Sequence, residues 1–447
     1  MPESSQKVNE SSLRRFITNV EGLAGDGQAF VLVDERMLKI PGFLPGDKVE
    51  LFIGANGRVI KADLLEPSPD RVKPDCFFHG PCGGCDLLEL SEKGRKREKQ
   101  AMIERALSHV PGGKDAYLHS FQASREIIRY MPRVRLHQSR NYEERESGYL
   151  ASENSEQTLT GGIVPVTSCA LLTPPLNRRL VATRKILTQV PIFLESLTLM
   201  SSSSHTSDRV VGHAVMMKGK PVGHFHKDLM KIMRAAGLKG LSVATYDNKI
   251  KEVHGTVNVT GLVATEVDGG PYDAEPSFFV QGNIFQNQVL IRKVVELCKP
   301  APGCRIIEGF AGAGNFTLAL AAKGATVEAV ESHPGAVRTG IRNIHNSGFA
   351  DRVQLLEGDA IKELSRFKTE PDVLLLDPPR TGTPGIGRII AKLQPGRIVC
   401  VFCDLNACEK DASAIVRSGY KLTEVAGLDL YPRTHHVETI CLFEKKV

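Results

Sequence analysis

Two stretches near the C-terminal end of the chain place reactive side chains directly after apolar runs. DVLLLDPPRTG (372–382) contains a strand-like run that ends at Asp377, and RIVCVFC (397–403) ends at Cys403. The carboxyl ends of parallel strands meet at one edge of a sheet, where open α/β sheets bind ligands. A carboxylate and a thiol at that edge favour nucleophilic chemistry. The alternative interpretation of Cys403 is a buried cysteine of the strand without a chemical role.

A third candidate lies in YPRTHHVETICLFE (431–444). Glu438 precedes the apolar run TICLF, which favours a partly buried carboxylate that acts as a base. The neighbouring His435 and His436 are candidates for the same site, and the alternative is that they are polar residues on the surface.

A glycine turn lies in IIEGFAGAGNFTLALAAKGATVEAVE (306–331). An apolar strand leads into Gly312-x-Gly314, a helix follows, and a second strand ends at Glu331. The glycines let the backbone approach a ligand closely, and the acidic residue 19 positions after Gly312 is suited to ribose hydroxyls. Thr317 stands where a dinucleotide fingerprint has its third glycine, which favours S-adenosylmethionine over NAD.

A cysteine cluster lies earlier in the chain. Cys76, Cys82 and Cys85 form C-x5-C-G-G-C, and Cys169 is a candidate distant fourth ligand. Zinc sites usually pair two short-spaced couples, whereas three close ligands and a remote one are nearer to iron–sulfur spacing. Zinc and a redox pair of Cys82 with Cys85 remain as alternatives.

The composition is that of a soluble protein with several domains. The chain has 447 residues, 41% hydrophobic and 24% charged, and a net charge of +6. It has no apolar stretch long enough to span a membrane, and its polar N-terminus predicts a cytoplasmic protein. Residues 121–250 contain 18 Lys/Arg and 10 Asp/Glu. This excess of positive charge suits a polyanionic partner such as RNA, and the alternative is a basic surface that contacts only solvent.

The order of the expected elements indicates three domains. Short strands with Gly/Pro turns up to about residue 65 predict a small OB-like β-barrel, assigned to 1–70. Residues 71–275 are predicted to form an α+β middle domain. It should contain a helix from Ser91 to about His109, whose charged run KGRKREK (93–99) is expected to be solvated.

From about Phe278 onward the pattern changes to alternating strands and helices, which predicts a doubly wound, Rossmann-like parallel sheet over 276–447. The fold class is therefore α/β. The strand candidates in this region are CRIIEGF, TVEAVE, VQLLEG, DVLLLD and RIVCVFC.

Taken together, the motifs resemble those of the RNA uracil-C5 methyltransferases, in the branch with a TRAM domain and an iron–sulfur cluster. The resemblance covers nearly the whole chain. Besides the motifs above it rests on FLPGDKV (43–49), PSPDRVKP (67–74), FVQGN (279–283) and HVET (436–439).

The resemblance implies that the chain forms 5-methyluridine in RNA with S-adenosylmethionine, Cys403 acting as the nucleophile and Glu438 as the base. It implies 23S ribosomal RNA as the substrate, with transfer RNA as the alternative, and a monomer without a membrane partner. The residues implied to bind S-adenosylmethionine are Gln281, Phe310, Asn315, Glu331, Asp359 and Asp377. The ligands implied for a [4Fe–4S] cluster are Cys76, Cys82, Cys85 and Cys169.

The nucleophile segment departs from the family pattern. The family has Ser-Cys-Asn-Pro, whereas this chain has Phe402-Cys403-Asp404-Leu405 and a second cysteine at Cys408. Two other classes of protein therefore remain as alternatives. One is a methyltransferase acting on a base amino nitrogen, which needs no cysteine nucleophile. The other is an RNA-binding protein whose methyltransferase domain has decayed.

Overall fold

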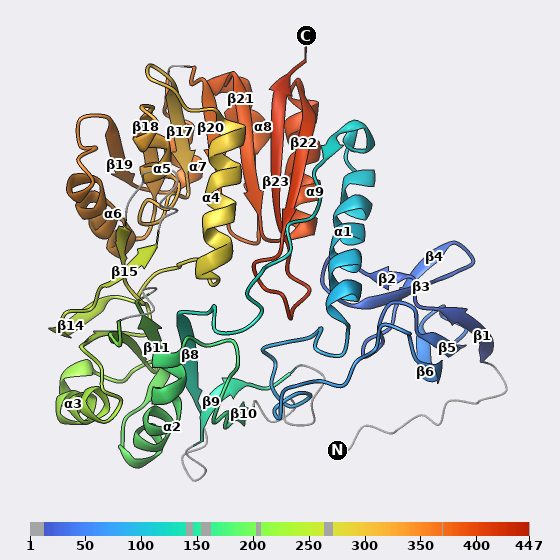
Figure 1. Cartoon of the computed structure of the whole chain (residues 1–447), viewed down its shortest axis with the longest axis horizontal. Coiled ribbons are helices and arrows are strands. Elements are labelled where there is room, and N and C mark those ends of the chain that lie inside the picture. Colours follow the sequence, from blue (N-terminus) through green and yellow to red (C-terminus); the bar gives the residue numbers. More distant parts are fainter. Residues whose placement is uncertain are drawn as a thin grey trace.

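The computed structural model describes residues 13–139, 146–152, 162–202, 207–262, 271–368 and 370–446. A large sheet near the C-terminus lies at one end of the molecule and a second sheet at the other, with the N-terminal strands to one side (Figure 1). Within the described residues, no helix is long and apolar enough to cross a membrane.

The C-terminal sheet has eight strands in the order β19-β18-β17-β20-β21-β23-β22-β7. Strands β17 to β21 pair in parallel, and β23 is antiparallel to both of its neighbours. The strand order reverses between β17 and β20, which is where open α/β sheets bind ligands. The bounds are β17 (Arg305–Gly309), β18 (Thr326–Glu331), β19 (Val353–Glu357), β20 (Val373–Leu376), β21 (Arg397–Phe402), β22 (Tyr420–Leu428), β23 (Glu438–Lys445) and β7 (Tyr117–Leu118).

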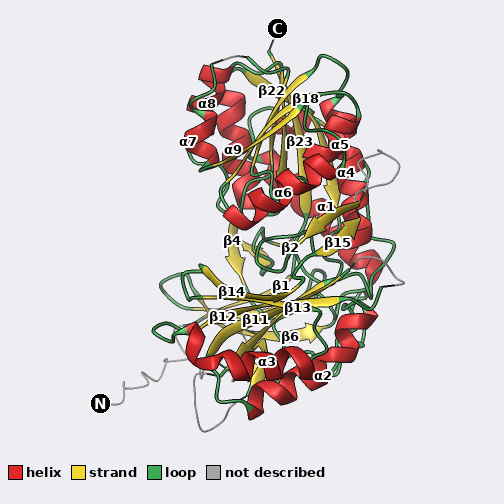
Figure 2. Cartoon of the chain, turned by 90° about the vertical axis from the view of Figure 1, so that its left-hand side faces the viewer, coloured by secondary structure: helices red, strands yellow, loops and turns green. Residues whose placement is uncertain are grey.

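Helices cover both faces of this sheet, with α4, α5 and α6 on one face and α7, α8 and α9 on the other (Figure 2). The predicted Rossmann-like alternation is confirmed, and all five predicted strand segments form strands. The bounds are α4 (Ile284–Cys298), α5 (Thr317–Ala322), α6 (Pro334–Asn346), α7 (Ala360–Leu364), α8 (Ile386–Leu393) and α9 (Leu405–Arg417).

The N-terminal strands form two three-stranded antiparallel sheets with a common core, where one small barrel was expected. The buried Asp47 fixes the following linker: its carboxylate accepts hydrogen bonds from the backbone N–H of Ser68 (2.8 Å) and from Arg71 Nε (2.9 Å). The bounds are β1 (Arg14–Asn19), β5 (Lys48–Ile53) and β6 (Val59–Glu66) in one sheet, and β2 (Gly22–Leu23), β3 (Ala29–Val33) and β4 (Arg36–Lys39) in the other.

The middle of the chain forms a seven-stranded mixed sheet in the order β10-β9-β8-β11-β12-β13-β14, packed against α2 and α3. A two-stranded ribbon, β15 (Val259–Leu262) and β16 (Pro271–Ala274), precedes the C-terminal sheet. The bounds in the middle sheet are β8 (Arg133–Gln138), β9 (Ser147–Leu150), β10 (Ile163–Val164), β11 (Leu194–Ser201), β12 (Val210–Met216), β13 (Gly240–Ala244) and β14 (Ile250–Gly255), with α2 (Pro174–Gln189) and α3 (His226–Ala235).

Helix α1 (Glu92–Ser108) forms where it was predicted, but the expectation of a solvated charged run is wrong. The side chains of Arg95, Glu98 and Lys99 are buried, because α1 packs against α9 and against β2. Lys99 Nζ lies 2.6 Å from Asp429 Oδ1 and 2.9 Å from the Tyr431 carbonyl oxygen. A charged run with buried partners cannot be distinguished from a solvated one by its composition.

The C-terminal sheet also contains residues from outside the predicted C-terminal domain, 276–447. β7 pairs in parallel with β22, and the backbone N–H groups of His119 and Gln122 donate to Val425 and Gly427 of the same strand at 2.8 and 2.9 Å. Residues 117–122 therefore cover the outer edge of β22.

Lys99→Met should lower the free energy of unfolding by about 3–5 kcal/mol, because it leaves the Asp429 carboxylate buried without its cation. Urea denaturation measures this change. Lys96→Met, at an exposed position of the same helix, is the matched control and should change stability by no more than about 0.5 kcal/mol. Equal effects of the two substitutions would contradict the assignment of a structural role to the buried pair.

Candidate active site

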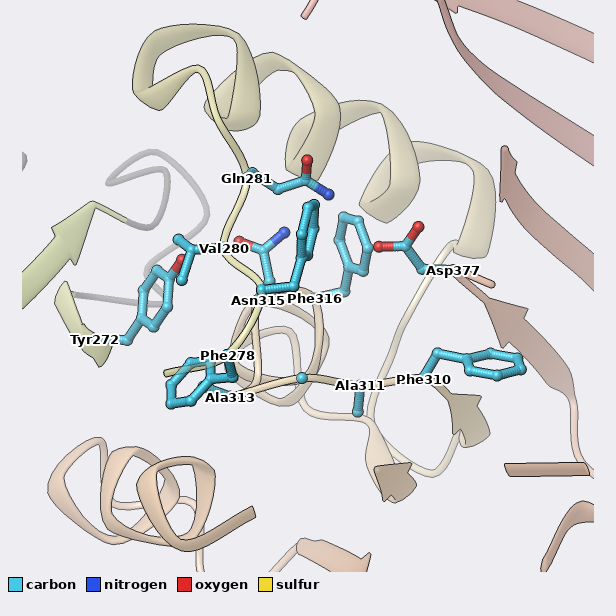
Figure 3. A pocket seen from close by; sticks show the side chains of 12 residues that line it. Tyr272, Phe278, Val280, Gln281, Phe310, Ala311, Ala313, Asn315, Phe316 and Asp377 are labelled. Carbon is cyan, nitrogen blue, oxygen red and sulfur yellow. The ribbon is translucent and has the colours of Figure 1, made fainter. Parts of the chain in front are cut away.

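A pocket lies at the switch point of the C-terminal sheet, between the segment that leads into α4 and the turn that follows β17. Figure 3 shows Tyr272 and Phe278 at one end of this pocket and Asp377 at the other. The lining residues are Tyr272, Phe278, Phe279, Val280, Gln281, Phe310, Ala311, Gly312, Ala313, Asn315, Phe316 and Asp377.

The turn after β17 is held in an unusual backbone conformation. Phe310, Gly312 and Gly314 have φ values of +65°, +57° and +99°, a region that L side chains rarely adopt. Glu331, at the end of β18, accepts a hydrogen bond from the Gly312 backbone N–H at 2.9 Å. The hydroxyl of Thr317 donates to Glu308 Oε2 at 2.6 Å, so the residue that replaces the third glycine has a structural partner.

The structure brings four of the six predicted cofactor residues into the pocket lining: Gln281, Phe310, Asn315 and Asp377. Glu331 borders the pocket through its bond to the turn. Asp359 does not line it: its carboxylate caps α7 by accepting from the Lys362 backbone N–H at 2.9 Å.

Sequence reasoning missed the apolar part of the lining. Tyr272 lies in β16, and Phe278 and Phe279 directly precede Val280 and Gln281. Phe279 is the first residue of FVQGN and Phe278 directly precedes it, so the motif itself is the signal that could have identified both.

The buried Gln281 provides a polar atom suited to a ligand. Its Oε1 has no hydrogen-bond partner among the described residues. In contrast, the amide of Asn315 already exchanges two hydrogen bonds with Asn287, at 2.8 and 3.1 Å. An unpaired acceptor in an aromatic pocket at the switch point fits a small polar molecule such as S-adenosylmethionine.

Beside this pocket, Asp377 follows β20, Cys403 follows β21, and Glu438 begins β23. Burial and the charge of Asp377, partly offset by Arg380, raise the pKa of Glu438 to about 8. Burial, together with the charges of Glu438 and Asp377, raises the pKa of Cys403 to about 12. The three groups are therefore close enough to influence one another's protonation, and Cys403 is a thiol in the free protein.

Arg380 brings positive charge to this group. Its Nη2 lies 2.8 Å from His436 Nε2, and burial lowers the pKa of that imidazole to about 4, so His436 is neutral and can accept the hydrogen bond. Burial alone raises the pKa of Asp377 to about 7.

The other cysteines of this region lie in the core. Cys400 is buried inside β21, and Cys408 is buried in α9 with its Sγ 3.8 Å from Cys441 Sγ. Cys403 is partly exposed. The residue after it, Asp404, caps α9 by accepting from the Ala407 backbone N–H at 2.9 Å, so the chain enters α9 directly where the family pattern has a proline.

The four cysteines of the predicted cluster come together at one place. Burial, together with the other three thiols, raises the pKa of Cys85 to about 12, and Cys169 has the largest effect among these thiols. A single zinc ion would require sulfurs about 3.8 Å apart, given Zn–S bonds of about 2.3 Å. The four cysteines do not form a group whose ligand atoms all lie within 4.8 Å of one another, whereas His226, Glu252 and His254 do. Four thiols, three of them close together in the sequence, are a donor set that fits an iron–sulfur core.

The chain resembles known methyltransferases over most of its length. The model of a family described as tRNA (Uracil-5-)-methyltransferase matches residues 270–446. A 23S rRNA (uracil(1939)-C(5))-methyltransferase RlmD of Shewanella sp. (strain ANA-3) is 30% identical over 92% of this chain and 91% of its own. The protein of the same name from Shewanella baltica (strain OS195) is 30% identical over 99% of this chain and 98% of its own.

One solved structure agrees in fold over nearly the whole chain. The Pyrococcus abyssi tRNA (uracil-54, C5)-methyltransferase, in complex with S-adenosyl-L-homocysteine, superposes with a TM-score of 0.67 and 20% identity, covering 96% of this chain and 100% of its own.

The sheet order, the glycine turn and the pocket at the switch point define a methyltransferase with a Rossmann-like fold. The chain belongs to the RNA uracil-C5 methyltransferases, enzymes that use S-adenosylmethionine to methylate C5 of uracil in RNA.

Glu438→Gln should raise the melting temperature of the free protein more at pH 8 than at pH 5. The native pKa of about 8 lies above the usual value of about 4.3, so Glu438 binds a proton on folding between these values. Its contribution to stability is therefore lost as the pH rises through that window, and glutamine removes this loss.

Glu444→Gln, on the same strand at a half-exposed position, is the control and should show no such pH trend. Thermal unfolding at several pH values measures both variants. The same trend in the two variants would contradict the burial of the carboxyl group at position 438.

Proposed function

We propose that this chain methylates C5 of a uracil in 23S ribosomal RNA, with Cys403 as the nucleophile and Glu438 as the base. The observation that carries the proposal is the convergence of Cys403, Glu438 and Asp377 beside the pocket at the switch point. S-adenosylmethionine bound there supplies the methyl group. Gln281, Phe310, Asn315 and Asp377 are proposed to contact it, with Glu331 beneath the turn.

Uracil C5 is a weak nucleophile, so the enzyme must first change the ring. The Cys403 sulfur adds to C6 as its thiolate, and the electron pair of the C5–C6 double bond moves toward O4 to give an enolate. C5 would then attack the methyl group in line, and the electron pair of the broken S–CH3 bond would stay on sulfur, which leaves a neutral thioether. Glu438 takes the proton from C5, and the thiolate leaves C6 as the double bond re-forms.

The electrostatics of the free protein support these roles. A base works best with a pKa near the operating pH, and the pKa of Glu438 is about 8. Asp377, whose pKa burial raises to about 7, is the candidate to accept the proton of the Cys403 thiol, which leaves Glu438 free to take the proton from C5. Arg380, the cation that lowers the pKa of Cys403 and Glu438, is suited to stabilise the enolate.

RNA carrying 5-fluorouridine at the target site tests the role of Cys403, because fluorine at C5 cannot leave as a cation and the adduct should be trapped. Mass spectrometry of the digested adduct should place RNA on the peptide that contains Cys403. Cys403→Ala should abolish both adduct and methyl transfer, and Cys408→Ala should retain both. Full activity in Cys403→Ala would favour methylation without a cysteine nucleophile.

The substrate assignment is supported by the relatives that match over nearly the whole chain, which are 23S rRNA methyltransferases by name. Transfer RNA is the second candidate, because the matching family description and the Pyrococcus abyssi enzyme both name it. In either RNA the target base must leave any stacked helix to reach Cys403, so a flipped or single-stranded uridine is expected.

Cells with and without the gene distinguish the two substrates. The proposal expects one or more 5-methyluridines to disappear from 23S ribosomal RNA on deletion, while the 5-methyluridine content of transfer RNA is unchanged. Mapping of both RNAs by mass spectrometry measures this. Loss of the modification from transfer RNA alone would reassign the substrate.

A [4Fe–4S] cluster on Cys76, Cys82, Cys85 and Cys169 is the second part of the proposal. Its support is the gathering of four cysteine side chains at one place, where burial raises the pKa of the Cys82, Cys85 and Cys169 thiols. Bound iron favours the thiolate form of each ligand. The division into a TRAM-like 1–70, a cluster-containing 71–275 and a catalytic 276–447 is proposed with it, the first two providing affinity for RNA.

Protein purified without oxygen should be brown and contain about four iron atoms per chain. Cys169→Ser should lose most of this iron, because a four-cysteine cluster then lacks one ligand, and Cys304→Ser, at a partly exposed position elsewhere, should not. Iron analysis and the visible absorption spectrum give the result. Stoichiometric zinc without iron would overturn the assignment.

A further inference from the structure

The segment from Asp429 to Val437 joins β22 to β23 and ends one residue before Glu438. We call it the strap. It contacts the loop that carries Cys76, Cys82 and Cys85, although more than 300 residues of chain separate the two. The contacts involve Asp75 and Asp86, the residues that directly flank this cysteine loop at its two ends.

Arg433 of the strap makes the first contact. Its Nη1 and Nη2 donate to the two carboxylate oxygens of Asp75 at 2.6 and 2.8 Å. The Arg433 side chain is only 6% exposed, and its carbonyl oxygen accepts from the Leu87 backbone N–H at 3.0 Å. A two-bonded pair with a buried guanidinium fixes both distance and orientation.

His435 makes the second contact and extends it toward the active site. Its backbone N–H donates to Asp86 Oδ1 at 2.9 Å, and its Nδ1 contacts the other oxygen of the same carboxylate. The ring of His435 lies 4.2 Å from the ring of His436, whose Nε2 is hydrogen-bonded to Arg380 at 2.8 Å. A continuous series of contacts therefore runs from Asp86 to Arg380.

Backbone hydrogen bonds hold the second half of the cysteine loop to the middle of the chain: the Gly83 N–H donates to the Leu150 carbonyl oxygen at 3.1 Å, and the Ser152 N–H donates to the Pro81 carbonyl oxygen at 2.8 Å. The side chains of the loop contribute less. Phe77 is 94% exposed, and Gly80, Gly83 and Gly84 contribute no side chains to a core. Four thiols without a common metal would be left as partly buried groups with no bond between them. A bound cluster would join the loop to Cys169 by covalent bonds and so fix Asp75 and Asp86.

We infer that Arg433 and His435 are positioning residues that make the placement of Glu438 and Arg380 depend on a metal-filled cysteine loop. The inference rests on the proposed function, which assigns the cluster and the catalytic pair. Loss of the cluster removes the bonds that hold the cysteines next to Asp75 and Asp86. The strap keeps its anchor at Asp429, but its two contacts with the loop weaken, and the base and the cation shift from the positions they need beside Cys403. The active site then fails while its pocket for S-adenosylmethionine stays intact.

Hydrogen exchange measured by mass spectrometry tests the strap directly. Anaerobically purified protein is compared before and after its iron is removed by an oxidant and a chelator. Backbone amides of 429–438 should exchange at least about tenfold faster after removal, whereas those of β17 and β18 should be unchanged. Affinity for S-adenosylhomocysteine should be retained.

Arg433→Ala should reproduce this state with the cluster present. We expect full iron content, fast exchange over 429–438, and trapping by 5-fluorouridine RNA slowed about 10- to 100-fold, because small misplacements of reacting groups cost that much. Arg433→Lys should recover only part of the rate, since lysine cannot form the two-bonded pair. Arg305→Ala is the control. It removes an ion pair between β17 and β18, formed with Glu328, and should change none of these measurements.

Combining the two perturbations gives the decisive result. If Arg433 acts by transmitting the position of the cysteine loop, removing iron from Arg433→Ala should slow trapping little further. Additive losses, or unchanged exchange of the strap in iron-free wild type, would overturn this inference while leaving the proposed function intact. Wild-type protein purified without oxygen that holds no iron would contradict the cluster proposal and this inference together.

Discussion

The buried ion pair between Lys99 and Asp429 is the interaction on which the arrangement of the active site depends. Burial lowers the pKa of Lys99 and raises that of Asp429, so each group is costly without the other. Helix α1 and the end of β22 must therefore meet. Two residues further on, the Tyr431 ring packs so closely against Gly282 that a side chain at that glycine would lie 2.7 Å from the ring. One ion pair thus fixes the base-bearing segment and, through Tyr431, the segment that enters the cofactor pocket.

The parallel sheet explains why so much of the site could be predicted from the sequence. Strand periodicity and the residues that end each strand are local properties, and parallel strands bring their carboxyl ends to one edge. Asp377 and Cys403 could therefore be expected at that edge before any coordinates were known. Glu438 was also predictable, because an acidic residue directly before an apolar strand is visible in the sequence. The catalytic roles of these residues stay predictions until the experiments above are done.

The remaining features depend on contacts between distant parts of the chain. Nothing around Lys99 distinguishes it from its exposed neighbour Lys96, because its partner lies 330 residues away. The family resemblance implied Asp359 in the pocket, but this residue does not line it and its carboxylate caps α7. The links of Asp75 and Asp86 to the strap were equally invisible, since a surface aspartate next to a cysteine has no local feature that specifies a partner.

The pairing of residues 117–122 with the outer edge of β22 has consequences for the folding of this protein and for the expression of its fragments. The pair Tyr117 and Glu424 closes a loop of roughly 300 residues, and such non-local pairing is slow to form. During synthesis residues 117–122 cannot pair with β22 until almost the whole chain has been made. A fragment beginning at residue 276 would leave the outer N–H and C=O groups of β22 unpaired, and an open edge of that kind is a template for aggregation.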